Sequence, residues 1–214
     1  AYAQYATAPV AHLAAKPTSL DFVQAAALPL VALTAWQALF GVAHLQRDQT
    51  VIIHGATGGV GHIAVQLAKA QGAHVIAVAS ARNADFVRGL GVERVIDSHE
   101  TELERSASAV DVVFDTVGGP NAPRLALTMK PGAAYVSIAW ALPSAEQIAD
   151  AKITAQGMLV HPDGQTLVDL AHWVERGLVT PVIERVFPLE HAAQAHELGE
   201  QGHVRGKIVL DTLS

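Results

Sequence analysis

Between residues 50 and 153, short runs of β-branched residues alternate with segments whose apolar residues recur every three to four positions. The first pattern is typical of strands and the second of helices with one buried face. We predict strands at 50–54, 74–79, 94–97, 110–115, 133–139 and 152–159, and mostly short helices at 59–71, 83–90, 121–129 and 144–150. Strands that alternate with helices form right-handed crossovers and a parallel sheet. The sequence therefore predicts a doubly wound α/β fold whose first two strands, apolar on both faces, are central.

The two ends of the chain follow a different pattern. Residues 1–7 alternate as a strand does, and the stretch 23–40 is apolar but interrupted by glutamine, proline and threonine. The interruptions favour a buried helix pair over a membrane span. Towards the C-terminus we predict helices at 166–176 and 189–198 and a closing strand at 207–211. These end segments need a partner to pack on.

Composition narrows the range of partners. The 214 residues are 50 % hydrophobic and 16 % charged, which suits a folded chain with one substantial core. The net charge is -6, and the Lys and Arg residues are scattered, so we expect neither a nucleic-acid nor a membrane partner. The absence of cysteine excludes disulfides and thiolate-bound metal, and we expect a cytoplasmic protein. Because the chain begins with Ala1, we also expect it to be a processed, trimmed or excerpted piece.

A glycine-rich run, Gly55-Ala56-Thr57-Gly58-Gly59-Val60-Gly61, joins the first predicted strand to an amphipathic helix. In the dinucleotide-binding fingerprint, glycines allow a tight turn, close approach of the backbone to pyrophosphate and close packing of helix on strand. We assign the approach to Gly58 and the packing to Gly61; Ala56 stands where the fingerprint has its first glycine. We predict a Rossmann unit that holds a dinucleotide with Thr57, Gly58, Gly59, Val60 and Gly61, against the alternative of a purely structural turn.

The residues after the second strand bear on which dinucleotide binds. A protein that binds NAD usually has a carboxylate about 20 residues after the fingerprint, to hold the ribose 2′-hydroxyl. Here Ser80 stands 19 residues after Gly61 and is followed by Arg82 and Asn83. A charge-assisted hydrogen bond from Arg82 to a 2′-phosphate is worth roughly 1.5–3 kcal/mol, or one to two orders of magnitude in affinity. We predict NADPH; the alternative is that Arg82 is an ordinary solvated arginine.

Other users of nucleotides fit the sequence poorly. A P-loop needs Gly-Lys-Ser/Thr where this chain has Gly61-His62-Ile63. A short-chain dehydrogenase needs a lysine four residues after its tyrosine, and none of the three tyrosines has one. A methyltransferase that uses S-adenosylmethionine would favour an acid after the second strand, where this chain has Ser80 and Arg82.

Four sequence motifs together resemble the zinc-independent quinone oxidoreductase branch of the medium-chain dehydrogenase/reductase superfamily. They are Ala-Ala-Ala-Leu-Pro at 25–29, Leu-Thr-Ala-Trp-Gln-Ala-Leu at 33–39, the glycine run with Ala-Val-Gln-Leu-Ala-Lys at 64–69, and Gly-His-Val-Arg-Gly-Lys at 202–207. The resemblance spans nearly the whole chain. It implies an NADPH-dependent reductase of quinones, enones or similar activated alkenes, built from a GroES-like barrel and a Rossmann domain.

In that family most of the barrel precedes a segment that resembles residues 1–5, so the resemblance implies that the substrate half is absent here. It divides the chain into a barrel remnant at 1–16, an NADP-binding Rossmann domain at 17–163 and a C-terminal helix and segment returning to the barrel at 164–214. No catalytic residue is assigned, because the substrate pocket belongs largely to the missing half. A non-catalytic NADPH sensor, or a structural or interaction module, is the alternative function.

The resemblance also implies cofactor contacts outside the glycine run. They are Thr34 and the backbone of Ile138, Ala139 and Trp140 at the nicotinamide, Thr116 and Val117 at the ribose, Lys207 near the cofactor, and Asn83 and Ser98 where many relatives have Lys and Tyr near the 2′-phosphate. For three of these residues, a structural role without cofactor contact is the alternative. Thr34 could hydrogen-bond within its own helix, Trp140 could be core instead of pocket wall, and Lys207 could be an ordinary surface lysine.

Metal binding and association complete these expectations. Zinc-dependent relatives place a cysteine ligand four residues before the threonine that matches Thr34, where this chain has Leu30. The 11 histidines show no ligand spacing, so we predict no metal and interpret His54 and His62 as strand-end, helix-surface or packing residues. Relatives pair through the edge of the Rossmann sheet, here 153–160, and we expect a homodimer through this apolar edge.

Overall fold

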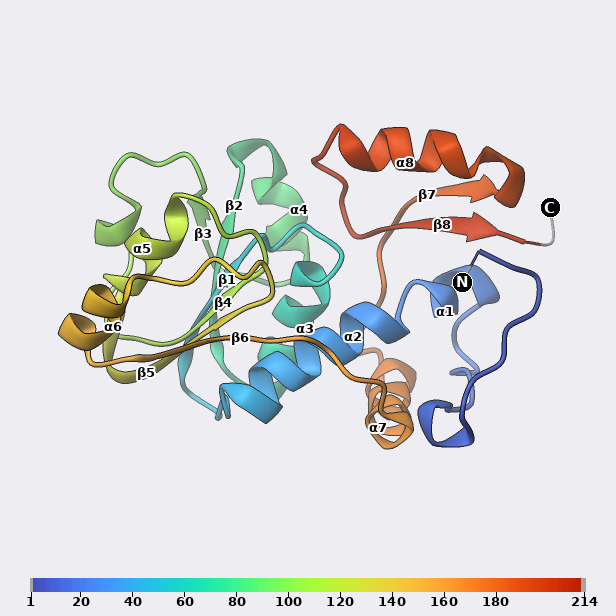
Figure 1. Cartoon of the computed structure of the whole chain (residues 1–214), viewed down its shortest axis with the longest axis horizontal. Coiled ribbons are helices and arrows are strands. Elements are labelled where there is room, and N and C mark those ends of the chain that lie inside the picture. Colours follow the sequence, from blue (N-terminus) through green and yellow to red (C-terminus); the bar gives the residue numbers. More distant parts are fainter. Residues whose placement is uncertain (1, 213–214) are drawn as a thin grey trace.

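The computed structural model describes residues 2–212 and contains a six-stranded parallel sheet of order β3-β2-β1-β4-β5-β6 (Figure 1). All five neighbouring pairs are parallel. The strands are β1 (Thr50–His54), β2 (His74–Ala79), β3 (Arg94–Asp97), β4 (Val110–Asp115), β5 (Met129–Ser137) and β6 (Thr154–Gly157). The chain starts at the centre, runs outward to β3 and returns to build the other half. This order confirms the predicted doubly wound α/β fold and creates a crevice between β1 and β4.

Helices cover both faces of the sheet. Alternate residues of each central strand point to opposite sides, and because both sets are apolar, both faces need a cover. Val51 and Ile53 of β1 pack in one cluster, while Ile52 packs in the other, and all three are buried. The first cluster lies under α2 (Pro29–Trp36), α3 (Gly61–Gln71) and α4 (Ala84–Gly89), and the second under α5 (Asn121–Ala126) and α6 (Ala145–Ala151). The glycine run between β1 and α3 thus sits at the middle of the sheet.

The helix boundaries follow local chemistry. Asp163 caps α7 (Gly164–Glu175) by accepting hydrogen bonds from the amides of Gln165 and Thr166, so this helix begins two residues earlier than predicted. Lys152 ends α6 in a left-handed conformation, which delays β6 and shortens it relative to the predicted 152–159. Strand β5 instead begins four residues early, at Met129, where α5 has already ended.

The N-terminal strand prediction is wrong. Ala1 lies outside the described residues, and residues 2–7 form no strand. They are exposed, as are the residues up to Leu13, and no neighbouring strand pairs with them. A lone strand has nowhere to place its hydrogen bonds, so the alternation in the sequence is not sufficient. A single 3-10 turn (Val10–His12), the short α1 (Phe22–Ala26) and α2 lead into the sheet unit. The predicted helix pair at 23–40 corresponds to α1, α2 and a π-helical turn.

The C-terminal part holds a strand that the sequence did not predict. Strand β7 (Ile183–Pro188) pairs in parallel with β8 (Lys207–Asp211), and α8 (Ala192–Glu200) crosses between them. In β7, the exposed Glu184 and Arg185 interrupt the apolar pattern that would indicate a strand, and only Phe187 is buried. This β7-β8 unit lies beside the N-terminal segment, at one end of the molecule (Figure 1). Whether residues 1–16 and 164–214 are functional parts of another domain stays a prediction. Within residues 2–212 no helix is long and apolar enough to cross a membrane.

Candidate functional site

The turn out of β1 depends on Gly55, not on the position of Ala56. Gly55 has a φ of 80°, in the left-handed region, and a Cβ there would overlap the hydroxyl of Thr116. Ala56 is fully buried in the core. The tight-turn role that the fingerprint gives to its first glycine is therefore filled one residue earlier, which explains why alanine is tolerated at 56.

Gly61 and Gly58 differ in how much space a side chain would have at each position. A Cβ on Gly61 would overlap the carbonyl oxygen of Gly55, so glycine is needed for helix α3 to pack against the turn, as the sequence indicated. A Cβ on Gly58 would meet nothing closer than 3.5 Å. Packing within the chain does not explain Gly58, whereas close approach of a ligand does.

The amides at the start of α3 are available to an anion. Helix α3 has Val60 as its N-cap with no side-chain cap, and no acceptor within residues 2–212 takes the amide hydrogens of Gly59 or Val60. Open amides at a helix N-terminus, together with its dipole, form an anion site. The glycine run thus fits a pyrophosphate by both space and hydrogen-bonding capacity.

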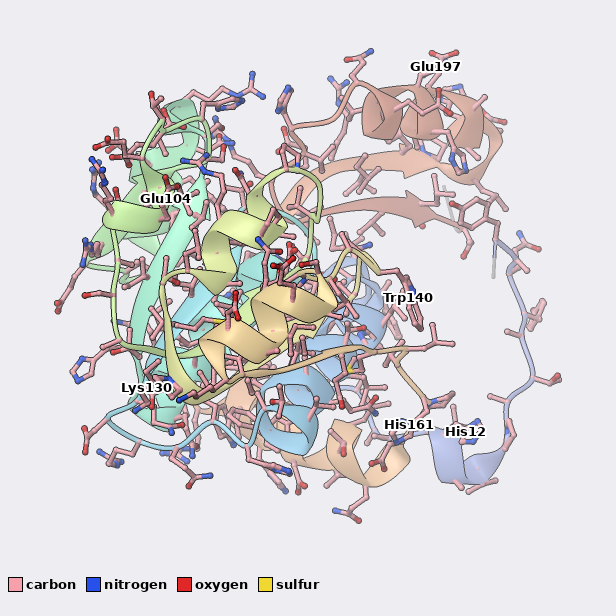
Figure 2. All side chains as sticks on the ribbon, turned by 60° about the vertical axis from the view of Figure 1, so that its left-hand side comes forward. His12, Glu104, Lys130, Trp140, His161 and Glu197 are labelled. Carbon is pink, nitrogen blue, oxygen red and sulfur yellow. The ribbon has the colours of Figure 1, made fainter. Side chains whose placement is uncertain are left out.

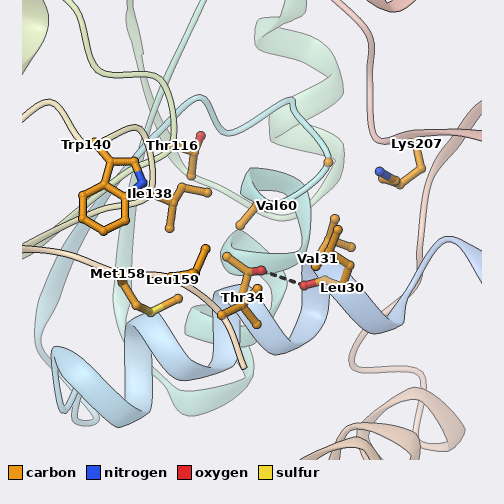
Figure 3. A pocket seen from close by; sticks show the side chains of 12 residues that line it. Leu30, Val31, Thr34, Val60, Thr116, Ile138, Trp140, Met158, Leu159 and Lys207 are labelled. Carbon is orange, nitrogen blue, oxygen red and sulfur yellow. Dashed lines mark hydrogen bonds between the residues drawn. The ribbon is translucent and has the colours of Figure 1, made fainter. Parts of the chain in front are cut away.

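A cavity of about 410 Å³ opens beside this loop (Figure 3). Helix α2, the ends of β4 and β5 and the segment after β6 enclose it. The structure brings seven of the predicted site residues to its walls: Thr34, Gly59, Val60, Thr116, Ile138, Trp140 and Lys207. The remaining walls are Leu30, Val31, Met158, Leu159 and Val160, so the cavity is mainly apolar. A pocket of this kind at the carboxyl ends of parallel strands is a common ligand site in α/β folds.

Thr34 lies on the wall contributed by α2. Its hydroxyl donates a hydrogen bond of 2.7 Å to the carbonyl oxygen of Leu30, within its own helix (Figure 3). This is the alternative that the sequence left open. The same oxygen keeps acceptor capacity and Thr34 lines the cavity, so the two roles of Thr34 are compatible.

Trp140 forms pocket wall and not core. Its side chain projects outward from the sheet unit and is 66 % exposed (Figure 2). The backbone has a φ of 57°, which is uncommon for a bulky residue and often marks a functional position. Its indole lies against Gly157 of β6, where a Cβ would stand 2.7 Å from a ring carbon. Gly157 therefore makes room for the ring.

A buried polar network fixes the loop after β4, which carries Thr116 and Val117. His54 Nδ1 lies 2.7 Å from Asp115 Oδ1, and Tyr135 donates to Asp115 Oδ2, also at 2.7 Å. The amides of Val117 and Gly118 donate to the same carboxylate at 3.0 and 2.8 Å. Asp115 is thus engaged in four hydrogen bonds, three at Oδ1 and one at Oδ2.

Electrostatics follow from this arrangement. Burial opposes ionisation of Asp115, but hydrogen bonds from His54 and the Gly118 amide outweigh it and hold the pKa of Asp115 below its ordinary value. Burial and the neighbouring carboxylate raise the pKa of Tyr135. Sequence reasoning identified His54 only as a strand end and did not identify Asp115 or Tyr135. The sequence signal for this network was a polar residue at the end of each of two otherwise apolar strands, His54 in β1 and Asp115 in β4.

A second missed residue, Gln37, holds the far wall of the cavity. Its buried side-chain amide donates to the carbonyl oxygen of His161 at 2.8 Å and accepts from the amide of His161 at 3.1 Å. These two hydrogen bonds tie the segment after β6 to the π-helical turn Gln37–Val42. A glutamine within an apolar run was the signal, and a π-helical turn frequently marks a functional region.

The residues predicted for the 2′-phosphate gather at the ends of β2 and β3, outside the cavity. The Ser98 amide donates to the carbonyl oxygen of Ala79, at the end of β2. Asn83 donates from Nδ2 to the Ser80 hydroxyl at 3.2 Å, and Arg82 is exposed beside them. No carboxylate in residues 2–212 pairs with Arg82.

His62 ties the glycine run to the β7-β8 unit. Its Nδ1 lies 2.9 Å from the Gly58 carbonyl oxygen, and its Nε2 accepts from the Val182 amide at 3.1 Å. Burial lowers its pKa, so the neutral ring with the proton on Nδ1 satisfies both contacts. His62 is therefore a packing residue. Among the residues that the structure describes, no three His, Cys, Asp or Glu side chains come together to hold a metal.

Comparison with known proteins shows the family to which this chain belongs. A family model described as zinc-binding dehydrogenase matches residues 90–210. A curated Arabidopsis thaliana protein named chloroplast envelope quinone oxidoreductase homolog is 31 % identical, over 98 % of this chain and 68 % of its own length. The chain belongs to this family of the medium-chain dehydrogenase/reductase superfamily. This confirms the resemblance seen in the sequence motifs.

Other relatives are longer than this chain. The bovine protein named NAD(P)H oxidoreductase RTN4IP1, mitochondrial, is 36 % identical over 92 % of this chain, which spans 58 % of the relative. An Arabidopsis thaliana protein named NADPH-dependent alkenal/one oxidoreductase, chloroplastic, is 33 % identical over 97 % of this chain and 52 % of its own length.

Solved structures share the fold. One reported as an NAD-dependent alcohol dehydrogenase has a TM-score of 0.92 at 29 % identity, covering 99 % of this chain and 65 % of that chain. The quinone oxidoreductase from Coxiella burnetii has a TM-score of 0.82 at 39 % identity, covering 91 % and 62 %.

The expectation of a cytoplasmic protein is wrong. It rested on the absence of cysteine, which is compatible with several reducing compartments. The bovine, mouse and human relatives are named as mitochondrial and the Arabidopsis relative as a chloroplast envelope protein, and none of these names is cytoplasmic.

Proposed function

We propose that this chain is the cofactor-binding part of an NADPH-dependent, zinc-independent reductase of quinones, enones or similar activated alkenes. The observation that carries the proposal is the continuity between the open amides of the glycine run and the apolar cavity lined by Thr34, Ile138 and Trp140. One region would hold pyrophosphate and the other a flat nicotinamide ring. When bound, NADPH supplies the hydride that reduces an electrophilic carbon.

The residues of the chain have defined parts in this proposal. Gly58, Gly59 and Val60 would bind the phosphates, while Thr116 and Val117, fixed by Asp115, would contact the ribose. The apolar walls would exclude water from the nicotinamide. The preference for NADPH rests on Ser80 and Arg82 and on the lack of a carboxylate at position 80. It is supported by the printed name of one NADPH-dependent relative, although one similar structure is reported as NAD-dependent.

Independence from zinc rests on Leu30, which stands where zinc-dependent relatives have a cysteine. Leu30 lines the cavity, so a metal there would face an alkyl side chain.

Isothermal titration of this chain with NADPH and NADH tests the cofactor assignment. Tight binding of NADPH and weaker binding of NADH support it, whereas equal affinities contradict the preference. Steady-state oxidation of NADPH with a panel of benzoquinones and enones, performed on the longer protein that contains this chain, tests the reaction. Tight binding without turnover by the longer protein would favour a non-catalytic NADPH-binding module.

We also propose a homodimer formed through β6. This strand is the edge of the sheet, and Leu159, just beyond it, is 77 % exposed. An exposed strand edge with an apolar side chain beside it favours pairing. Sedimentation velocity at micromolar concentration should show a dimer, and a monomer at all concentrations would contradict the proposal.

A further inference from the structure

The loop between α8 and β8 crosses directly over the glycine run. The Gly206 amide donates to the Thr57 carbonyl oxygen at 2.8 Å. Gly206 has a φ of 68°, and a Cβ there would overlap the carbonyl oxygen of Val182, so only glycine fits. The residues on either side of Gly206 reach different parts of the site. Lys207 lies beside Gly59 at the cavity, and Arg205 reaches Asn83, after β2.

Arg205 reaches the residues already assigned to the 2′-phosphate. Its Nε donates to Asn83 Oδ1 at 3.1 Å, and Asn83 in turn donates from Nδ2 to the Ser80 hydroxyl at 3.2 Å. Asn83 is only 3 % exposed, so it is a fixed anchor. The guanidinium carbon also lies 5.9 Å from the centre of the Phe86 ring, within the range of a cation-π contact. Two direct contacts thus link Arg205 to the segment that follows β2, and Asn83 extends the link to Ser80.

The remaining donors of Arg205 are open. A guanidinium has five N–H donors, and the bond to Asn83 uses one of them. No acceptor within residues 2–212 takes the terminal ones, and no carboxylate pairs with the guanidinium. Glu184 Oε2 accepts from the backbone amide of Arg205 at 3.0 Å and not from its guanidinium. The side chain therefore presents a fork of donors with the geometry that suits phosphate.

Cations and carboxylates both lie around this point. Arg82 and Arg205 are both exposed cations; Arg82 directly precedes Asn83 in the chain, and Arg205 contacts Asn83. Asp85 is paired with Arg88 at 2.8 Å. Asp97 and Glu184 are the opposing charges. A hydrogen bond from the His99 amide is the main cause that lowers the pKa of Asp97, and the Ala81 amide contributes. Two guanidinium groups and two carboxylates balance in number, so the attraction for a phosphate rests on the open donors of Arg82 and Arg205.

We infer that Arg205 is a second phosphate-binding arginine, which acts with Arg82 and Ser80 to distinguish a 2′-phosphorylated adenosine from one with a free 2′-hydroxyl. The inference rests on the proposed function, because it requires a dinucleotide on the glycine run. It extends that function by assigning cofactor specificity to the β7-β8 unit as well as to the Rossmann sheet. The ligand class is any adenosine nucleotide that carries a 2′-phosphate.

The experiment compares Arg205→Gln and Arg205→Lys with a matched control, Arg185→Gln. Arg185 belongs to the same β7-β8 unit and also stacks on an aromatic ring, 5.5 Å from the centre of Phe187, but has no contact with Asn83. Affinities for NADPH, NADH and 2′,5′-ADP are measured by isothermal titration, and thermal melting checks that each variant is folded. The mononucleotide isolates the adenosine end from the nicotinamide cavity.

Arg205→Gln should weaken NADPH and 2′,5′-ADP by roughly 10- to 100-fold and leave NADH within about twofold, because a 2′-hydroxyl gains little from a cation. Arg205→Lys should retain part of the preference, and Arg185→Gln all of it. An unchanged preference in Arg205→Gln, or an equal loss for NADPH and NADH, would overturn the inference. If the unmodified chain binds neither dinucleotide, or binds both equally, the proposed cofactor assignment itself fails, and the two failures are distinguishable.

Discussion

His54 and Asp115, at the ends of adjacent strands β1 and β4, form a buried pair with 2.7 Å between Nδ1 and Oδ1. The pair joins the strand that leads into the glycine run to the strand that leads into the Thr116–Val117 loop. Because Asp115 also accepts from the Val117 and Gly118 amides, it positions both sides of the crevice in which the cofactor is proposed to bind.

Replacement of Asp115 by Asn should destabilise the protein substantially. The carboxylate accepts from His54, Tyr135 and two amides, and an NH₂ group would face one of these donors. We expect a loss of about 2–4 kcal/mol in the free energy of unfolding, measured with urea. Asp111→Asn, at the opposite end of β4, is the control. Asp111 pairs with the half-exposed Lys130 and accepts from the Thr50 amide, a bond that asparagine can keep, so it should lose only about 1 kcal/mol. Equal losses would contradict a special role for Asp115.

Two glycine substitutions separate folding from ligand binding. Gly61→Ala should cost more than about 3 kcal/mol, because its Cβ would overlap the Gly55 carbonyl. Gly58→Ala should leave thermal stability almost unchanged, because its Cβ meets nothing closer than 3.5 Å, but should weaken both NADPH and NADH at least about tenfold.

Gly89→Ala is the matched control for these two variants. Gly89 lies in α4 with open space around its Cβ position, so the change should raise stability by about 0.5 kcal/mol and leave cofactor affinity unchanged. Full dinucleotide affinity in Gly58→Ala would show that phosphates do not approach the backbone at this position.

The stability of the protein should fall as the pH is lowered from about 7 to about 5, partly because of His62. Burial lowers the pKa of His62 in the folded state from the ordinary 6.5. Below 6.5 the unfolded chain therefore binds a proton that the folded chain does not, and stability decreases until the pH reaches the folded pKa. His62→Gln should be less stable at neutral pH and show a flatter dependence in this window. An unchanged slope in urea unfolding across this window would contradict the assignment.

Zinc should have no effect on this protein. Purified protein should contain far less than one equivalent of zinc by inductively coupled plasma mass spectrometry, and treatment with EDTA should leave the melting temperature and NADPH affinity unchanged. A stoichiometric zinc ion whose removal lowers stability would show that ligands other than cysteine are used.

Much of the fold could be predicted from local patterns. β-branched runs, helical periodicity and the glycine run between Thr50 and Ile153 predicted the six strands and their parallel arrangement, because hydrophobic periodicity and glycine sterics act over a few residues. The glycine run likewise located the centre of the candidate site, and the role of Gly61 in packing followed from its position. Where alternation lacked a partner strand, as at residues 2–7, the same reasoning failed.

Long-range contacts decided the rest. The charged segment of β7 gives no sign of its pairing with β8, since strand formation there depends on residues 23 or 24 positions further along the chain. His54 meets Asp115 across 61 residues, and Arg205 meets Asn83 across 122. No local pattern specifies such pairs, because their energies arise only when burial and hydrogen bonding bring the groups together. The sequence alone determined that a dinucleotide loop lies at the centre of a parallel sheet, and only the tertiary structure decided which polar side chains surround it.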